Sequence, residues 1–258
     1  MRRWIAIVIF AAALAGCATA PPNVVPDFAA RPYVPFNRED AVAIALREWR
    51  LFGSLSDLPG SPEPAVAKPE RAPGLWERIG EYWWLGLGGQ GREARWTGRH
   101  DENGRVFPAL DDEHYAWSAA FISYVMRIAG AGDRFPYAAN HAAYVNAAAS
   151  GRSAILAAHA PQSYAPKLGD ILCFGREWAS GLRFSDLPKG GFWPGHCALV
   201  VARQDIILSV VGGNDEDAVT MDHVSIASDG GLSSFNHRLE WPIVIEVRYD
   251  AEFEPGPR

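Results

Sequence analysis

The chain has 258 residues, of which 48% are apolar and 21% are charged, so it is neither a disordered nor a collagen-like chain. This length suits one globular domain with additional segments. The formal net charge is −6 and no basic stripe is visible, which argues against a nucleic-acid partner.

Residues 1–16 have the pattern of a secretory signal. Two arginines precede an apolar run over residues 4–14, and small residues follow it. The run is too short for a permanent membrane span, which needs about 20 residues. The sequence therefore predicts export across a membrane.

Residues 14–17 read Leu-Ala-Gly-Cys and resemble the bacterial lipobox. This resemblance implies that Cys17 becomes the lipidated first residue and anchors the mature chain to a membrane. Ala18 follows it, and the absence of Asp there favours the outer membrane, facing the periplasm. The alternative is an ordinary secretory signal in which Cys17 is incidental.

The rest of the chain changes from helical to strand periodicity along its length. Residues 17–36 form a linker rich in Pro, Ala and Val, and residues 54–74 form a Pro-rich loop. Apolar spacing predicts helices over 37–53, 75–87, 115–130 and 139–149. Strands are predicted over 168–174, 196–202, 206–211, 219–226 and 243–249.

Helices followed by strands with short turns predict an α+β fold with an antiparallel sheet. We divide the chain into a signal (1–16), a linker (17–36), an N-terminal helix and loop (37–74), a main domain (75–250) and a tail (251–258).

Two further residue types have alternative interpretations. The Trp-rich stretch from Trp76 to Trp117 fits a hydrophobic core better than a sugar-binding stripe. Cys173 and Cys197 would be exported to an oxidising compartment, where a disulfide is possible. We favour two buried free thiols for this pair.

Three segments stand out as candidates for chemistry. They cover 117–125 at a helix start, 168–174 entering a strand, and 195–201 opening another strand, and a Gly-Gly-Asn turn follows at 212–214. Their order resembles that of the papain-like NlpC/P60 and CHAP cell-wall hydrolases. In those enzymes a nucleophilic Cys begins a helix, a Gly-Asp strand follows, and the next strand opens with the catalytic His.

Residues 77–249 are more closely similar to the bacterial family DUF2272. The motifs that carry this similarity are Tyr82-Trp83-Trp84, the 117–123 segment, Phe135-Pro136-Tyr137, Gly169-Asp170 and Gly195-His196. They span about two thirds of the chain.

The chain departs from the hydrolases at the nucleophile, because Ser118 stands where they have Cys. A helix N-terminus lowers the pKa of a thiol far more usefully than that of a hydroxyl, so Ser118 would need His196 as a general base. The alternative is that Ser118 caps the helix and His196 satisfies a backbone group. Cys197 should point away from the His196 side of its strand, and Cys173 is a remoter nucleophile candidate.

A third group would orient His196. Asn214 matches the Gly-Asn turn best, with Asp215 and Asp217 as rivals that a solvated turn would also explain. Trp117, His141 and Asp170 are candidate substrate contacts.

No cofactor is expected, because neither a phosphate loop nor a dinucleotide fingerprint occurs. No metal is expected either, since the acidic and histidine-containing runs at 100–102 and 111–114 lack zinc-ligand spacing. The resemblance implies an envelope lipoprotein whose Ser118, His196 and Asn214 cleave an amide in peptidoglycan or a muropeptide. The alternative is a non-catalytic lipoprotein that binds peptidoglycan or a partner protein through the same cleft.

Overall fold

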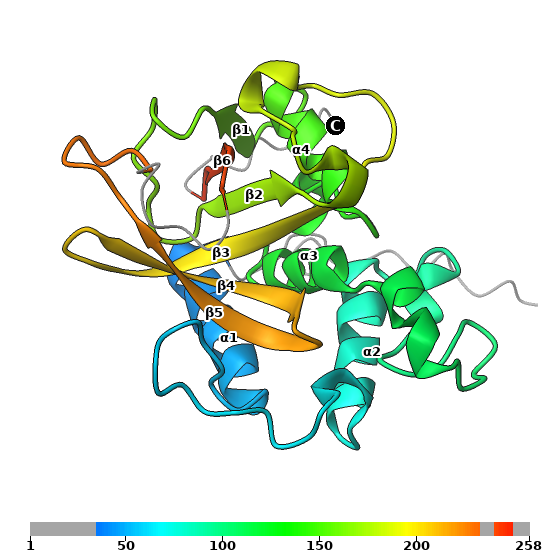
Figure 1. Ribbon diagram of the computed structural model, residues 1–258. Coiled ribbons are helices and arrows are strands. Elements are labelled where there is room, and N and C mark those ends of the chain that lie inside the picture. Colours follow the sequence, from blue (N-terminus) through cyan, green and yellow to red (C-terminus); the bar gives the residue numbers. More distant parts are fainter. Residues whose placement is uncertain (1–34, 233–239, 250–258) are drawn as a thin grey trace, which may run out of the picture. The chain divides into compact units, whose positions relative to one another are not determined.

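A computed structural model describes residues 35–232 and 240–249 of the chain (Figure 1). The predicted signal, the lipidation residue Cys17, most of the linker and the tail at 251–258 lie outside these residues. Within them, no helix is long and apolar enough to cross a membrane.

Helices precede a six-stranded antiparallel sheet, which confirms the α+β prediction. The helices are α1 (Arg38–Leu51), α2 (Leu75–Gly86), α3 (Ser118–Ile128) and α4 (His141–Ala149). The strands are β1 (Leu156–His159), β2 (Ile171–Gly175), β3 (Gly195–Gln204), β4 (Ile207–Asp215), β5 (Ala218–Ser225) and β6 (Ile243–Val247). Short 3-10 helices occur between them at Pro69–Arg71, Glu93–Arg95, Ala109–Tyr115, Gly132–Arg134, Glu177–Ala179 and Phe184–Asp186.

The strands lie in the order β1-β6-β2-β3-β4-β5, and each neighbouring pair is antiparallel. The central pair β2 and β3 sets the register around the candidate site, with Phe174 opposite His196 and Cys173 opposite Cys197. Since successive strand residues point to opposite faces, these two pairs lie on opposite sides of the sheet.

One face of the sheet is covered by helices and the other carries a smaller cluster. Cys173, Cys197 and Leu199 belong to the large core shared with the helices. Ala198 and Val200, which alternate with them, pack with Trp241 in the smaller cluster. Figure 1 shows α3 between the sheet and α2, and α1 also contacts β3, β4 and β5.

Local sequence explains where two of the helices begin. Asn37 accepts a hydrogen bond from the backbone N–H of Asp40 at 2.7 Å, which caps α1. Asn140 caps α4 in the same way, through the N–H of Ala143 at 3.1 Å. Because the Asn140 cap fixes the first residue of α4, it also fixes where His141 starts that helix.

Sequence and structure differ in two elements. The helix predicted from residue 115 begins at Ser118, because the 3-10 helix Ala109–Tyr115 precedes it. Strand β1 was not predicted; its sequence, Leu-Ala-Ala-His, has neither β-branched residues nor clear alternation. It exists because it pairs with β6, which lies nearly ninety residues later in the chain.

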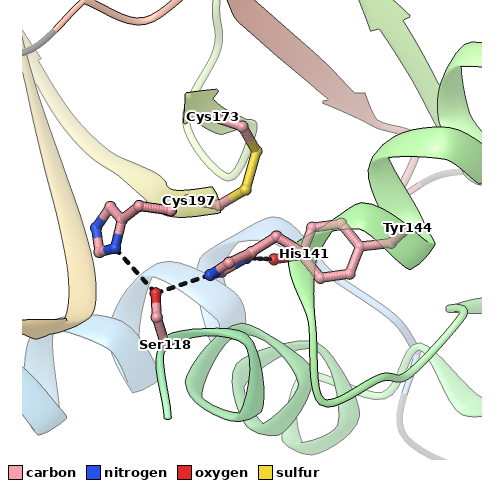
Figure 2. Close-up of a disulfide and its surroundings, with 6 residues drawn as sticks. Ser118, His141, Tyr144, Cys173 and Cys197 are labelled. Atoms are coloured by element: carbon pink, nitrogen blue, oxygen red, sulfur yellow. Dashed lines mark hydrogen bonds between the residues drawn. A yellow bond between two sulfur atoms is a disulfide. The ribbon is translucent and has the colours of Figure 1, made fainter. Parts of the chain in front are cut away.

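The preference for free thiols is wrong, because Cys173 and Cys197 form a disulfide between β2 and β3 (Figure 2). Their directly opposed positions bring the Cα atoms to 4.2 Å. The sequence could not reveal this register, which depends on how the two strands pair. Neither sulfur is available as a nucleophile while the disulfide is intact.

Candidate functional site

Ser118 is the first residue of α3 and lies almost completely buried, with 5% of its surface exposed. The N-cap position belongs to Trp117, which makes no capping hydrogen bond with its side chain. The interpretation of Ser118 as an N-cap is therefore wrong, and its hydroxyl serves another purpose. The first-turn N–H groups of α3 lack the side-chain cap that Asn gives α1 and α4.

The hydroxyl of Ser118 lies between two imidazoles (Figure 2). Its Oγ is 3.0 Å from Nδ1 of His196, at the start of β3, and 2.8 Å from Nε2 of His141, at the start of α4. The two rings are 6.0 Å apart between centroids. Three elements that begin far apart in the sequence thus converge on one oxygen atom.

Two consecutive glycines in β4 make room for this arrangement. A Cβ at Gly212 would lie 2.7 Å from Nε2 of His196, and one at Gly213 would lie 2.6 Å from the Trp117 ring. Real Cβ atoms do not approach so closely, so a side chain at either position would displace the imidazole or the start of α3. The Gly-Gly pair is therefore required for close packing on both faces of β4.

His141 is held from its other side by Tyr144, one helical turn later. The Tyr144 hydroxyl hydrogen-bonds to Nδ1 of His141, and both side chains are buried. Burial lowers the pKa of His141 well below its ordinary value, and the neighbouring His196 and Arg176 lower it further. His141 is therefore neutral at physiological pH.

Sequence reasoning placed His141 among possible substrate contacts and missed its bond to Ser118. The spacing of His141 and Tyr144 on one helix face was a usable signal for their pairing. The sequence contains no comparable signal for the contact between the starts of α3 and α4, because that contact depends on tertiary packing.

Asn214 lies at a bulge near the end of β4, with a φ of 61°. No hydrogen bond among the described residues joins it to His196, so its orienting role stays a prediction. Its rival Asp215 is buried and pairs with Arg176 at 3.4 Å, whereas Asp217 pairs with Lys68 at 3.0 Å. Both acids therefore have partners outside the Ser118 cluster.

Trp117 is 1% exposed and packs against the rings of Phe52 and Tyr82, each with a centroid 5.8 Å away. Its indole N–H donates to Oε2 of Glu70 at 2.9 Å. Burial raises the pKa of Glu70 to about 7, and nearby Asp217 and Asp112 add to this effect. In this conformation Trp117 anchors the start of α3 and does not present a surface for substrate.

Asp170 is fully buried next to β2, and its carboxylate has three partners. Oδ1 accepts the N–H of Val247 at 3.0 Å, and Oδ2 accepts the N–H of Lys167 at 2.8 Å and the hydroxyl of Tyr164 at 2.9 Å. These bonds join the entry of β2 to β6. Asp170 therefore stabilises the sheet and is not part of the Ser118 cluster.

The tryptophan-rich stretch is mostly core, as the sequence favoured. Trp83 and Trp96 are buried with Trp117, whereas Trp84 is 51% exposed. Across residues 35–232 and 240–249, no group of three or more His, Cys, Asp or Glu side chains could hold a metal ion.

The fold and the cluster together define an α+β protein with a buried serine held between two histidines at a helix N-terminus. The family described as "Uncharacterized protein conserved in bacteria (DUF2272)" matches residues 70–247, and the chain belongs to it. No curated protein and no solved structure matches the chain.

Proposed function

We propose that this chain is an envelope hydrolase that cleaves an amide bond in peptidoglycan or a muropeptide by acyl transfer through Ser118. The observation that carries the proposal is the 3.0 Å hydrogen bond between Oγ of Ser118 and Nδ1 of His196, at the N-terminus of α3. A serine needs such a base, because its own pKa is far too high for it to ionise unaided.

The reaction would follow the order of other serine acyl transfers. Oγ of Ser118 attacks the amide carbon while its proton passes to Nδ1 of His196. The resulting oxyanion lies near the uncapped N–H groups at the start of α3, which stabilise negative charge. The C–N bond then breaks, and His196 gives its proton to the leaving amine. Water next attacks the acyl-serine with His196 again as base, which releases a carboxylic acid and restores Ser118.

The order of the segments supports the substrate class. Ser118 begins a helix, Asp170 precedes β2 and His196 opens β3, which is the order of the corresponding residues in the NlpC/P60 and CHAP hydrolases. Asn214 remains our candidate for the group that orients His196 during turnover.

The disulfide supports an exported location, because such bonds persist mainly in oxidising compartments. Together with the signal and lipobox patterns, it supports a lipoprotein anchored through Cys17, with its folded part facing the periplasm from the outer membrane.

The direct test incubates the full chain with purified muropeptides and identifies products by chromatography and mass spectrometry. We expect new amine and carboxyl termini with wild type and none with Ser118→Ala. Ser123→Ala is the matched control, because Ser123 lies on the same helix and bonds to the carbonyl of Ala138. A wild type that yields no product from any muropeptide would overturn the hydrolase proposal.

Burial favours a second candidate, a non-catalytic binding lipoprotein. Ser118 is 5% exposed and His196 only 1%, so a substrate would need an opening motion to reach them. Under this alternative, wild type and Ser118→Ala bind peptidoglycan sacculi equally well in a sedimentation assay and neither produces new termini. Thiol-dependent hydrolysis by Ser118→Cys would instead show that only the nucleophile is missing.

A further inference from the structure

The Tyr144 hydroxyl determines the direction of the hydrogen bonds around Ser118. Tyr144 is fully buried, and Nδ1 of His141 is the only hydrogen-bond partner of its hydroxyl among the described residues. Burial raises the pKa of this phenol well above its ordinary value, so it keeps its proton. A buried hydroxyl donates wherever an acceptor is in reach, and Nδ1 of His141 is that acceptor.

This donation fixes the tautomer of His141. A neutral imidazole has one N–H, and if Nδ1 accepts from Tyr144 the hydrogen must be on Nε2. Nε2 lies 2.8 Å from Oγ of Ser118, so it donates to that oxygen. The opposite tautomer would leave the proton of the buried Tyr144 hydroxyl without an acceptor among the described residues.

The same direction of hydrogen-bond donation continues through Ser118. Its oxygen receives the hydrogen of His141, so its own proton is free to point toward Nδ1 of His196, 3.0 Å away. His196 must accept at Nδ1, and its neutral form therefore has the hydrogen on Nε2. One chain of donation runs from Tyr144 through His141 and Ser118 to His196.

We infer that His141 is a second catalytic imidazole, which donates from Nε2 to Oγ of Ser118, and that Tyr144 is the positioning residue that sets its tautomer. This inference rests on the proposed function of Ser118 as the nucleophile. As Oγ gives up its proton to His196, the donor on His141 stabilises the partial negative charge that Oγ carries until its bond to the amide carbon is complete. Throughout the attack His141 keeps its proton, so the proton balance of the reaction is unchanged.

The first test measures the tautomers without any substrate. In ¹⁵N-labelled full-length protein, NMR couplings between ring nitrogens and ring protons distinguish a protonated Nε2 from a protonated Nδ1. We expect both His141 and His196 to be protonated at Nε2 and not at Nδ1. A His141 protonated at Nδ1 would overturn the inference.

Substitution of Tyr144 sharpens this test. Tyr144→Phe removes only the hydroxyl, so His141 should gain a population protonated at Nδ1. Tyr137→Phe is the matched control, since the Tyr137 hydroxyl donates to the carbonyl of Gly132 at 2.7 Å and the described structure gives it no bond to the Ser118 cluster. An unchanged His141 tautomer in Tyr144→Phe would contradict the positioning role.

Turnover of muropeptides separates this inference from the proposed function. We expect His141→Ala to lower kcat by about 100-fold or more, as the loss of a donor to a reacting oxygen does. We expect His141→Gln to recover part of the lost kcat, because the Gln amide can donate.

An active wild type with a fully active His141→Ala would overturn the inference and leave Ser118 as nucleophile. If every variant, wild type included, were inactive while the tautomers were as expected, the catalytic role would fall with the proposed function and the hydrogen-bond direction would stand. Should His141→Ala not fold, Tyr144→Phe provides the same rate comparison.

Discussion

Two clusters of buried polar side chains in this molecule satisfy their hydrogen-bonding groups by different means. Around Glu48, on α1, charges are paired: Arg78 contacts both carboxylate oxygens, at 2.7 and 2.6 Å, and Tyr82 donates at 2.8 Å. Around Ser118, the hydroxyl and His141 are neutral, and one oxygen is hydrogen-bonded to two imidazole nitrogens.

The difference indicates what each cluster does. Burial raises the pKa of Glu48, but the bonds from Arg78, Tyr82 and Arg47 outweigh it and lower the pKa overall. A carboxylate stabilised in this way stays ionised and takes up no proton. The cluster holds α1 against α2 and α3. In the Ser118 cluster, protons lie between groups that can exchange them, which suits proton transfer.

The largest effect should come from removing the base. We expect His196→Ala to reduce muropeptide hydrolysis by on the order of a million-fold, the loss that follows removal of the base from a serine catalytic set. His159→Ala is the control, because that histidine pairs with Glu246 at the edge of the sheet. Equal loss in both variants would mean that the effect is structural.

The next effect is on stability. Glu48→Ala leaves Arg78 and Tyr82 buried without their acceptor, so we expect the free energy of unfolding to fall by about 3–5 kcal/mol. Chemical denaturation measures it. Glu81→Ala removes an exposed partner of the same arginine and should cost less than about 1 kcal/mol. Equal stability of the two variants would show that the Glu48 cluster does not hold α1 against α2 and α3.

The disulfide provides a third, slightly smaller effect. It closes a loop between residues 24 positions apart, so replacing both Cys173 and Cys197 by Ala should lower the free energy of unfolding by about 2–4 kcal/mol. The same loss is expected when wild type is denatured under reducing conditions. Identical denaturation midpoints for oxidised wild type and the double variant would contradict a stabilising bond.

The last effect is gradual and depends on pH, and it concerns Glu70, the acceptor of the Trp117 indole. Its folded pKa of about 7 is above its ordinary value of 4.5, so the folded state binds the proton more tightly than the unfolded state. The resulting stabilisation is complete below the unfolded pKa and is lost as pH rises through about 7, by at most about 1.4 kcal/mol per pH unit.

Denaturation at a series of pH values between about 5 and 8 tests this dependence. Glu70→Gln mimics the protonated carboxyl and should flatten the profile, whereas Glu77→Gln, at an exposed position near the start of α2, should not. Parallel profiles for wild type and Glu70→Gln would show that the Glu70 carboxyl does not titrate as described.

The parts of the fold that the sequence predicted are those with strong local signals. Apolar periodicity predicted α1, and the strand-like apolar segments predicted β3 and β4. The Ser118–His196 pair came from a family resemblance, since the two residues are 78 positions apart.

What the sequence did not predict depends on tertiary register. The Cys173–Cys197 bond requires those two residues to be opposed across β2 and β3, and a shift of one residue would separate them. In the same way, His141 reaches Ser118 only because two helix starts meet. Asp170 looked like a site residue in sequence, yet it binds backbone N–H groups of the sheet.

Covalent labelling with a fluorophosphonate is the sharpest test of whether His196 activates Ser118. Such reagents modify serines that have a base within hydrogen-bond reach. We expect one added label on wild type, mapped by peptide mass spectrometry to Ser118, and none on Ser118→Ala or His196→Ala. A folded wild type that stays unlabelled, or a His196→Ala variant labelled as fast as wild type, would contradict it.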